Sequence, residues 1–450
     1  MKKYLQESKH RSRRRWVACF SDARCEKGEC YHAAVALSDD DGRTWRYVAV
    51  PAAKDVPRLH PGDKRPHWFN NGCEPSVAEL ANGELLLALR TSGERHRFSR
   101  STDGGETWSA PEERAEFWAA NTMPLFFRLS DGRLLFFWNN TAMLPTLSLS
   151  EYPELSKGER TGRWECAFTN RDALHAAISE DDGRTWRGFR EILLNPIRNA
   201  SDFRENGNDP AQENDKSVHQ TQAIELPGGK VLVACGQGVS SRRILVFDPR
   251  WLYETERAED FRSGLGGVST HLYVRSLSGG NRGWSGHCAW NRIPGALLVR
   301  EPDTGPATKR EALQICRIAD PRLVSDRQGV VWNFPAARKG RVKIECRIEG
   351  EGFKLTLADL WMNPCDEVGP SRCPFSTAVT GREASPGLWH EIEASWDAEK
   401  NVVSLSCDGK KCLDAPFAVE SPAGVSYLHL QTLAERHDPK GAYFRSFRKR

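Results

Sequence analysis

Two residues of opposite charge flank one predicted pair of strands. Glu74 stands directly before Pro75 at a predicted strand start, and Arg90 ends the apolar run at 84–89. An arginine in that place is unusual, because arginine is rarely buried without a partner. A guanidinium attracts a carboxylate by its charge and orients it by two parallel hydrogen bonds, so such arginines could recognise an acidic substrate. The alternative is that Glu74 is a solvated carboxylate at a sheet edge.

Three polar residues take comparable places elsewhere in the chain. His219 and Gln222 stand at the start of a predicted strand, at the same relative position as Glu74 in its own unit. The correspondence is weaker for Asn121. We expect these side chains on the face that holds the site. The alternative for His219 is a structural histidine that hydrogen-bonds in the interior.

An eight-residue pattern that occurs three times must help to position these residues. Ser-x-Asp-x-Gly-x-Thr-Trp stands at 38–45, 101–108 and 179–186. It predicts a hairpin turn in which Asp caps backbone amides, Gly takes a positive φ and Trp packs back on the strands. We expect these aspartates to hold turns on the rim, away from the site, and to take no part in catalysis.

A second recurring unit supplies further strands. Segments 76–92, 125–141 and 222–238 each read as strand, glycine-containing turn and strand, which predicts antiparallel meanders. Four-stranded units that repeat around an axis describe a β-propeller, which we expect over 16–282. Four units are readable before residue 255. Six blades of about 40–45 residues each would just fit the length, and a smaller propeller is the alternative.

The chain changes character at about residue 283. No further eight-residue pattern occurs, and longer strands with period-two alternation predict a β-sandwich over 283–450. The polar segment 196–218 predicts an exposed loop, and no long helical pattern is present. The fold class is therefore all-β. Four tryptophans of the C-terminal part can form a sugar-stacking platform or, more commonly, a core: Trp332, Trp361, Trp389 and Trp396.

The eight-residue pattern is the Asp-box, or BNR repeat, and residues 16–255 resemble the sialidase (neuraminidase) superfamily of β-propeller proteins. The C-terminal part resembles a concanavalin- or laminin-G-like domain. The resemblance to sialidases implies a tyrosine nucleophile backed by a carboxylate, a second carboxyl group as acid/base, and arginines that bind a sugar acid.

In the first blade the resemblance assigns three residues. Arg24 takes the place of an arginine at a strand end, and Glu29 falls near the acid/base position. Asp22 either orients Arg24 or serves as the carboxylate in place of Glu29. A surface salt bridge in a charged loop is the alternative for Arg24 and Glu29.

Later segments carry the remaining assignments. The segment 71–92 is similar to the sialidase segment whose glutamate polarises the nucleophilic tyrosine and whose arginine grips the substrate carboxylate, which assigns Glu74 and Arg90. A further clamp arginine is expected late in the propeller, and Arg243 is preferred to Arg242. Tyr273 is assigned as the nucleophile by its order in the chain.

The sequence departs from the family pattern in two places. No Arg-Ile-Pro motif precedes Arg24, where the family has its first clamp arginine, and Tyr253 is a second tyrosine near the late position. We expect an exo-glycosidase of the sialidase type that hydrolyses a terminal, acidic sugar from a glycan. One alternative is a non-catalytic carbohydrate-binding propeller that has lost the nucleophile and the first clamp arginine. A structural or protein-binding propeller is another. The mechanism implies no cofactor and no metal.

The composition excludes other classes of function. The 450 residues include 64 Lys and Arg against 60 Asp and Glu, so the net charge of +4 is far below the basic excess of a nucleic-acid binder. No uninterrupted apolar run approaches the roughly 20 residues that a membrane-spanning helix needs. We expect a glycan partner, and neither nucleic acid nor a membrane.

The cysteines and the N-terminus bear on the compartment. The 13 cysteines include no CxxC pair and make no zinc site of that kind. They are either reduced thiols or local bridges of an exported protein, the close pairs being Cys25/Cys30, Cys365/Cys373 and Cys407/Cys412. The basic tail at 1–15 lacks the apolar segment of a secretory signal. The sequence as written predicts a cytoplasmic protein, or an exported one if the N-terminus is truncated.

Overall fold

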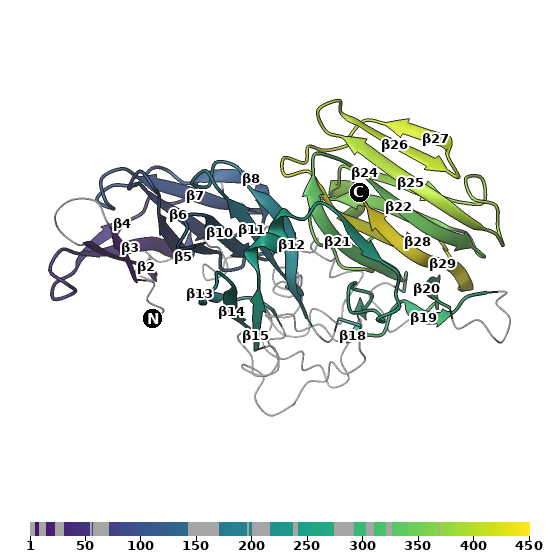
Figure 1. The fold of residues 1–450 in the computed structure, drawn as a ribbon, viewed down its shortest axis with the longest axis horizontal. Helices are drawn as coiled ribbons and strands as arrows, with labels where there is room; N and C mark the ends of the chain where they lie inside the picture. Colours follow the sequence, from purple (N-terminus) through teal and green to yellow (C-terminus); the bar gives the residue numbers. More distant parts are fainter. Residues whose placement is uncertain are drawn as a thin grey trace, which may run out of the picture.

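The structure, a computed structural model, is built from β-strands joined by turns and loops (Figure 1). It describes residues 5–8, 15–22, 31–54, 56, 72–142, 171–195, 198–199, 217–236, 242–273, 292–302, 310–320, 326–367 and 369–450. The helical segments in these ranges are two short 3-10 helices, η3 (Pro249–Tyr253) and η4 (Gly369–Arg372). Among the described residues no helix is long and apolar enough to cross a membrane. The predicted all-β class is confirmed.

Four antiparallel sheets follow one another in the first part of the chain, and we call them units one to four. Unit one contains β1 (Leu5–Ser8), β2 (Arg15–Asp22), β3 (His32–Ser38) and β4 (Arg46–Ala49). Unit two contains β5 (Cys73–Glu79), β6 (Leu85–Arg90), β7 (Arg95–Ser101) and β8 (Glu112–Trp118). Unit three contains β9 (Leu125–Arg128), β10 (Leu134–Trp138), β11 (Ala173–Ser179) and β12 (Arg187–Leu194). Unit four contains β13 (Gln222–Glu225), β14 (Val231–Cys235) and β15 (Arg243–Phe247). In every unit, strands that are consecutive in the chain are neighbours in the sheet, as expected of meanders.

The three Asp-boxes form the turns between the third and fourth strands of units one to three. In the second box, Asp103 accepts hydrogen bonds from Thr107 N at 2.9 Å, Thr107 Oγ1 at 2.5 Å and Ser101 Oγ at 2.8 Å. Gly105 has a φ of 94°, and Trp108 Nε1 donates to its carbonyl at 3.1 Å. Burial raises the pKa of Asp103, but the Thr107 bonds outweigh burial and hold that pKa at about 2. The other two boxes repeat these contacts, so the predicted turn is confirmed.

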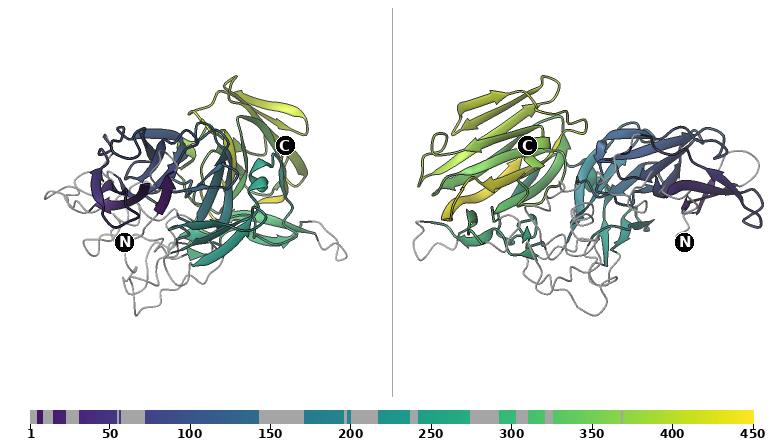
Figure 2. Two further views of the ribbon diagram at one scale, coloured as in Figure 1. Left: turned by 60° about the vertical axis from the view of Figure 1, so that its left-hand side comes forward. Right: turned by 180° about the vertical axis from the view of Figure 1, so that it is seen from behind.

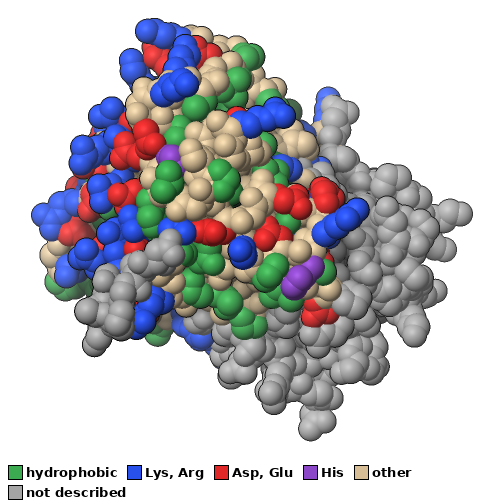
Figure 3. Space-filling model, turned by 90° about the vertical axis from the view of Figure 1, so that its right-hand side faces the viewer, with side chains coloured by type: hydrophobic (Ala, Val, Ile, Leu, Met, Phe, Trp, Pro, Cys, Tyr) green, Lys and Arg blue, Asp and Glu red, His purple; other side chains and the backbone are tan. Residues whose placement is uncertain are grey.

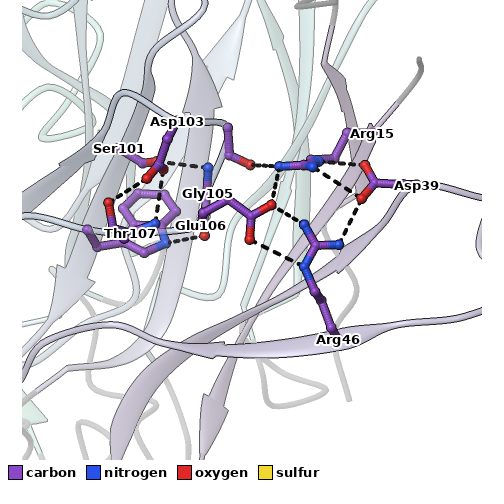
Figure 4. A network of polar contacts seen from close by, with 10 residues as sticks. Arg15, Asp39, Arg46, Ser101, Asp103, Gly105, Glu106 and Thr107 are labelled. Atoms are coloured by element: carbon purple, nitrogen blue, oxygen red, sulfur yellow. Dashed lines mark hydrogen bonds and ion pairs between the residues drawn. The ribbon is translucent and has the colours of Figure 1, made fainter.

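Charged side chains join the first Asp-box to the second (Figure 4). Arg15 Nε donates to Asp39 Oδ1 at 2.6 Å, and Arg15 Nη1 lies 2.9 Å from Glu106 Oε1. Arg46 bridges the same two carboxylates, with Nη1 2.8 Å from Asp39 Oδ2 and Nη2 in contact with Glu106. Arg15 Nη1 also donates to the Gly104 carbonyl at 3.1 Å. A single exposed ion pair contributes little, but this network holds two consecutive turns against each other.

Each unit packs face to face on the next, and apolar side chains fill the space between them. Units one and two share a core that includes Val17, Val35, Leu37, Val77, Leu87 and Leu89. Units two and three share an aromatic core that includes Phe98, Phe117, Phe126, Phe136 and Trp138. Units three and four share Leu125, Phe137, Leu174, Val218, Val231 and Val233. The units therefore form a row in chain order. Each strand alternates its side chains between the two faces of its sheet, so the apolar ones can pack against the neighbouring unit.

This row is open in the described part of the chain, so the prediction of a six-bladed closed ring is not confirmed. The outer face of unit four leaves Ile224, Ile244 and Val246 exposed. Beyond η3, the segment β16 (Arg257–Glu259) leaves the row and pairs with a strand of the C-terminal part. The sequence pattern identifies the units, but it does not reveal that the chain changes direction at this point.

Two large sheets form the C-terminal part of the chain (Figure 1). The first follows the order β19 (Leu297–Arg300), β20 (Glu311–Arg317), β29 (Asp438–Lys449), β22 (Lys339–Ile348), β25 (Trp389–Asp397), β26 (Val402–Cys407) and β27 (Lys410–Ala415), with β16 beside β29. The second follows the order β21 (Gly329–Ala337), β28 (Val425–Thr432), β23 (Phe353–Ala358) and β24 (Phe375–Val379). A small sheet pairs β17 (Leu272–Tyr273) with β18 (Arg292–Ile293).

The two large sheets pack face to face around one core. Ile344 of β22, Ile392 of β25 and Phe444 of β29 meet Leu355 of β23 and Leu430 of β28 in this core. Its alternating buried residues are those expected when each sheet has one inward face.

The tryptophans of this part lie mainly in the interior. Trp332 and Trp396 belong to the core between the two sheets, and Trp361 is buried where the sheets meet the units. A sugar-stacking platform built on these three side chains is therefore wrong, and the core alternative is confirmed. Trp389 is partly buried beneath the guanidinium of Arg445, whose Cζ lies 3.7 Å from the ring centroid.

Buried contacts join units two and three to the C-terminal sheets, which lie beside them in both views of Figure 2. Trp118 of β8 donates through Nε1 to Asp359 Oδ1 at 2.9 Å. Tyr427 of β28 donates to Glu191 Oε1 of β12 at 2.8 Å and also contacts His175 Nε2 of β11. We call this contact region the junction. It also contains Ala142, Ala173, Val331, Leu360, Trp361 and Met362.

Two boundaries differ from the predicted divisions at residues 15 and 283. The backbone of Leu5–Ser8, which falls in the predicted tail, pairs with β2 from Leu5↔Ala18 to Ser8↔Arg15. The chain joins the C-terminal sheet already at β16, well before residue 283. Hydrogen bonding between strands distant in sequence determines both boundaries, which a change in residue pattern does not reveal.

The surface and the thiols agree with the composition. Figure 3 shows the end of the molecule formed by the C-terminal sheets, where Lys and Arg side chains lie interspersed with Asp and Glu. Within the described ranges no disulfide joins Cys365 to Cys373 or Cys407 to Cys412. The pair Cys25/Cys30 lies outside the described residues.

Candidate functional site

The first element of the candidate site is an ion pair within one hairpin. Strands β5 and β6 are antiparallel, with Cys73 opposite Arg90, so the start of β5 lies beside the end of β6. The register shifts between Cys73 and Ser76, and Glu74 takes a φ of 39° at this bulge. Arg90 Nη1 then donates to Glu74 Oε2 at 2.6 Å. The hairpin thus brings together the two residues that the sequence analysis considered first.

Glu74 is the more accessible partner of this pair. Its side chain is 31% exposed, whereas that of Arg90 is 11% exposed. Burial raises the pKa of Glu74, but the charge and hydrogen bond of Arg90, together with the Gln220 amide, outweigh it and lower the pKa to about 2. Glu74 is therefore a carboxylate at any physiological pH, and it cannot act as a general acid in this arrangement.

Unit three contributes two buried residues beneath the pair. Asn121, which precedes β9, accepts through Oδ1 from Arg90 Nε at 3.1 Å. Its carbonyl accepts from Nη2 of Arg171, which precedes β11, at 2.5 Å. Both residues are fully buried. Arg171 was not among the predicted residues, and its only sequence signal is a charged pair, Arg171-Asp172, directly before an apolar run.

Unit four closes the arrangement. Arg171 Nη1 lies 3.3 Å from His219 Nε2, and Ser217 Oγ lies 2.5 Å from His219 Nδ1. Because a guanidinium only donates, Nε2 is the acceptor and the neutral ring carries its proton on Nδ1, toward Ser217. Gln220 Nε2 donates to both oxygens of Glu74, at 3.2 and 3.3 Å.

These contacts, together with the peptide bond that joins His219 to Gln220, form a ring of polar residues from three units, which we call the Glu74 circuit. It consists of Glu74, Arg90, Asn121, Arg171, His219 and Gln220. Three of them have a positive φ: 39° at Glu74, 50° at Asn121 and 61° at Gln220. A non-glycine residue in this region is strained, and such strain gathers at functional sites. The circuit is therefore more than a chance surface ion pair.

The Asp-boxes lie at the opposite end of the sheets. In unit two the box residue Ser101 pairs with Leu85 at the start of β6, while Arg90 ends the same strand. The expectation that the boxes hold turns away from the candidate site agrees with this geometry.

The structure brings Gln220 to Glu74, a contact that the sequence analysis missed by two positions. Gln222, the predicted residue, is the first residue of β13, pairs with Ala234 and is exposed. A signal for Gln220 is present in the sequence. The turn at 226–229 and the turn at 80–83 are separated by the same 146 residues that separate Gln220 from Glu74.

The first-blade residues are only partly described. Asp22 ends β2 and accepts from the Tyr47 hydroxyl at 2.6 Å. Its neighbour Ser21 accepts through Oγ from the backbone amide of Glu74 at 2.7 Å, so this strand end adjoins the circuit. Arg24 and Glu29 lie outside the described residues.

The late residues lie apart from the circuit contacts given above. Arg243 begins β15, and its Nη1 donates to the carbonyl of Arg242 at 2.7 Å. The backbone of Tyr273 pairs with Arg292 in the small sheet. Tyr253 ends η3 and donates to Glu180 at 2.9 Å.

Within the described ranges one group of three side chains has the spacing for a metal ion: His390, Cys407 and Asp408. His390 Nδ1 already lies 2.7 Å from Asp408 Oδ2, and its Nε2 lies 3.1 Å from the Ser385 carbonyl. Burial raises the pKa of Cys407 to about 11. Both ring nitrogens of His390 are thus already engaged within the protein.

Comparison with solved structures finds similarity to sialidases. The chain is similar to the Trypanosoma rangeli sialidase in complex with sialic acid (13% identity, TM-score 0.32), over 97% of this chain and 66% of that chain. It is similar to the intramolecular trans-sialidase from Ruminococcus gnavus in complex with oseltamivir carboxylate (15%, TM-score 0.34), over 56% and 44%. It is also similar to the leech intramolecular trans-sialidase complexed with 2,7-anhydro-Neu5Ac (16%, TM-score 0.32), over 53% and 30%. The chain thus spans less than two thirds of the length of each of these proteins.

A search of curated protein sequences finds no match. A family model gives the more specific result, because it matches a continuous stretch that contains all three Asp-box turns and most of the Glu74 circuit. Residues 5–203 match the BNR repeat-like domain.

Proposed function

We propose that the protein is a glycoside hydrolase of the sialidase type, which removes a terminal acidic sugar from a glycan at the Glu74 circuit. The observation that carries the proposal is the circuit itself, in which three consecutive units converge on one partly exposed carboxylate and one arginine. The BNR repeat-like match over 5–203 and the resemblance of 71–92 to the sialidase segment support the same assignment.

The chemistry of the circuit suits part of a retaining mechanism. A glycosidase stabilises an oxocarbenium-like transition state, and a fixed carboxylate near the anomeric carbon contributes to this. Glu74, with a pKa of about 2, supplies a permanent negative charge. It can therefore polarise a nucleophile or stabilise positive charge, while a different carboxyl group must donate the proton. Asp22, at the adjoining strand end, is the described candidate for that role.

A non-catalytic carbohydrate-binding protein is the second candidate, and one observation favours it. The described tyrosine hydroxyls with assigned partners bind groups outside the circuit: Tyr47 binds Asp22, Tyr253 binds Glu180, Tyr427 binds Glu191 and Tyr443 binds Gln314. The assigned contacts of the Glu74 carboxylate are with Arg90 and Gln220. A site with this arrangement and no nucleophile would hold an acidic sugar without cleaving it.

The finer description of the fold belongs to the same proposal. We infer that the row of units is part of a sialidase-like β-propeller, because its sheets stack face to face in chain order. The exposed apolar face of unit four, with Ile224, Ile244 and Val246, is where a further blade would pack. The two C-terminal sheets around one core have the arrangement of a concanavalin-like β-sandwich.

The test is hydrolysis of a chromogenic α-sialoside and a chromogenic β-glucuronide by the wild type, Glu74→Gln and Arg90→Ala. We expect activity on one acidic glycoside and a loss of about 100-fold or more in kcat/KM in each variant, the effect of removing one preorganised electrostatic group. Because Glu74 stays ionised far below neutral pH, the acid limb of the wild-type profile must report another group.

A matched control pair exists on the same sheet. Glu84 and Arg100 form an exposed ion pair at 3.6 Å at the opposite end of β6, and the Glu84 side chain is also 31% exposed. Glu84→Gln and Arg100→Ala should retain wild-type activity. Binding without hydrolysis, weakened by Arg90→Ala and unaffected by Arg100→Ala, would establish the second candidate. Absence of both binding and hydrolysis would refute both.

A further inference from the structure

A cavity of about 680 Å³ opens beside β12 and shares no residue with the Glu74 circuit. Strand β12, the segment that follows η3, and residues 266–267 enclose it. Its charged and aromatic lining consists of Arg190, Glu191, Arg198, Trp251, Glu254, Glu256 and Arg257. None of these residues was singled out by the sequence analysis.

Arg190 is the residue of interest in this cavity. It is 2% exposed, and its guanidinium stacks on Trp251 with Cζ 3.8 Å from the ring centroid. Its Nη1 lies 3.6 Å from Glu254 Oε2, which is an ion pair beyond hydrogen-bond distance. Neither Nε nor Nη1 has a hydrogen-bond partner in the structure. A buried charged group whose N–H groups make no hydrogen bond costs free energy. Such N–H groups therefore indicate a bound ligand or water.

The other two arginines of the cavity use their donors on backbone carbonyls. Arg257 donates to the Asn333 carbonyl at 2.5 Å and to the Gly267 carbonyl at 3.3 Å. Arg198 donates to the carbonyls of Asn195 and Val268, both at 2.9 Å. Neutral carbonyls satisfy hydrogen bonds but carry no charge, so the nearby acidic groups are Glu191 for both arginines and Asp172 for Arg198.

Arg190 and Arg257 repel each other at this cavity, whose lining also contains the carboxyl groups of Glu254 and Glu256. Burial, followed by the nearby charge of Arg257, outweighs the opposing effect of Glu254 and lowers the pKa of Arg190 to about 10. Burial also raises the pKa of Glu191 to about 7, so this carboxyl group is partly protonated near neutral pH. Glu254 is more than half exposed and is screened by water. An anion between the arginines would relieve both the repulsion and the unmade hydrogen bonds.

We propose that this cavity is an anion-binding subsite, in which Arg190 holds the carboxylate or sulfate group of an acidic sugar by its free Nε and Nη1 hydrogens. Both groups are oxyanions that accept charge-assisted hydrogen bonds from a guanidinium. Trp251 fixes the plane of Arg190 by stacking, and Arg257, which also lines the cavity, adds positive charge. The subsite is independent of the Glu74 circuit, so it can be tested whether or not the protein hydrolyses glycans.

The experiment is calorimetric titration of the full chain with sodium glucuronate, inorganic sulfate and uncharged glucose. We expect saturable binding of the oxyanions and none of glucose, and the comparison of glucuronate with sulfate identifies the preferred source of the anion. Arg190→Gln should weaken this binding at least about tenfold, the effect of losing about 1.4 kcal/mol. Glu254→Gln should strengthen it, because the competing carboxylate is removed.

The two variants are expected to change the affinity in opposite directions. This distinguishes the proposal from a folding defect, because a damaged fold cannot tighten binding. Arg250→Gln is the charge-matched control. Arg250 adjoins Trp251 in the chain, its side chain is 82% exposed, and it pairs with Asp248 outside the cavity. Arg90→Ala controls for binding at the Glu74 circuit. Equal losses in Arg190→Gln and Arg250→Gln, a loss confined to Arg90→Ala, or no saturable binding by the wild type would each overturn the proposal.

Discussion

Tyr427 Oη donates to Glu191 Oε1 at 2.8 Å across 236 residues of sequence, and this bond joins β28 of the C-terminal part to β12 of unit three. His175 extends it. Its Nδ1 accepts from the Asn140 amide at 3.0 Å, so its Nε2 carries the proton and donates to Tyr427 Oη. Burial lowers the pKa of His175 to about 3, which keeps the ring neutral. The donors and acceptors of the three side chains thus agree in direction from one part of the chain to the other.

Tyr427→Phe is expected to weaken the junction. The change removes the hydroxyl and leaves His175 and Glu191 without their buried partner, which costs about 1–3 kcal/mol. The measurement is the free energy of unfolding from urea titration. Tyr443→Phe is the control, because that hydroxyl accepts from Gln314 at 2.9 Å near the surface. Equal stability of the two variants would show that the junction bond contributes little.

Glu191 is expected to make stability fall as pH rises through a defined window. Burial raises its pKa from 4.5 to about 7, so the folded protein binds a proton that the unfolded chain has lost. The free energy of unfolding therefore declines between about pH 4.5 and about pH 7, by about 1.4 kcal/mol per unit at most. In Glu191→Gln this decline should be absent. Urea midpoints at about pH 5 and about pH 8 test the prediction, and parallel changes in both proteins would contradict it.

Gly105→Ala is expected to destabilise the protein more than Gly132→Ala. Both glycines have nearly the same φ, 94° and 93°, so the backbone strain of an alanine is matched. A Cβ at Gly105 would lie 2.9 Å from Cδ2 of the buried Leu37, whereas one at Gly132 meets nothing within 4 Å. Overpacking of this kind adds about 1–3 kcal/mol. Thermal unfolding of the two variants measures the difference, and a difference near zero would mean that Leu37 moves aside freely.

Local features were predictable from the sequence. The Asp-box turn is complete within eight residues, so its contacts follow from residue types alone, as at Asp103 and Thr107. The proximity of Glu74 and Arg90 follows from one hairpin with a recognisable turn. In both cases the residues that interact are close in sequence and hydrogen bonding of the backbone fixes their distance.

Contacts between units were less accessible to sequence reasoning. Gln220 reaches Glu74 only because units two and four converge on unit three, and the stacking of sheets does not follow from the pattern of any single sheet. Arg171 is buried under Asn121, where composition would not place a charge. The row ends where β16 leaves it and joins the C-terminal sheet. This depends on pairing with β29, near the end of the chain.

The apolar surface at the junction has a consequence for how the molecule loses its structure. Trp118 and Ala173 of the units pack with Trp361 and Leu360 of the C-terminal part in one buried cluster. Unfolding of either region would expose the apolar side chains of the other, including its tryptophan, to water. The two regions should therefore unfold in one cooperative calorimetric transition, and a fragment that ends between them should bind a hydrophobic dye that the intact chain does not.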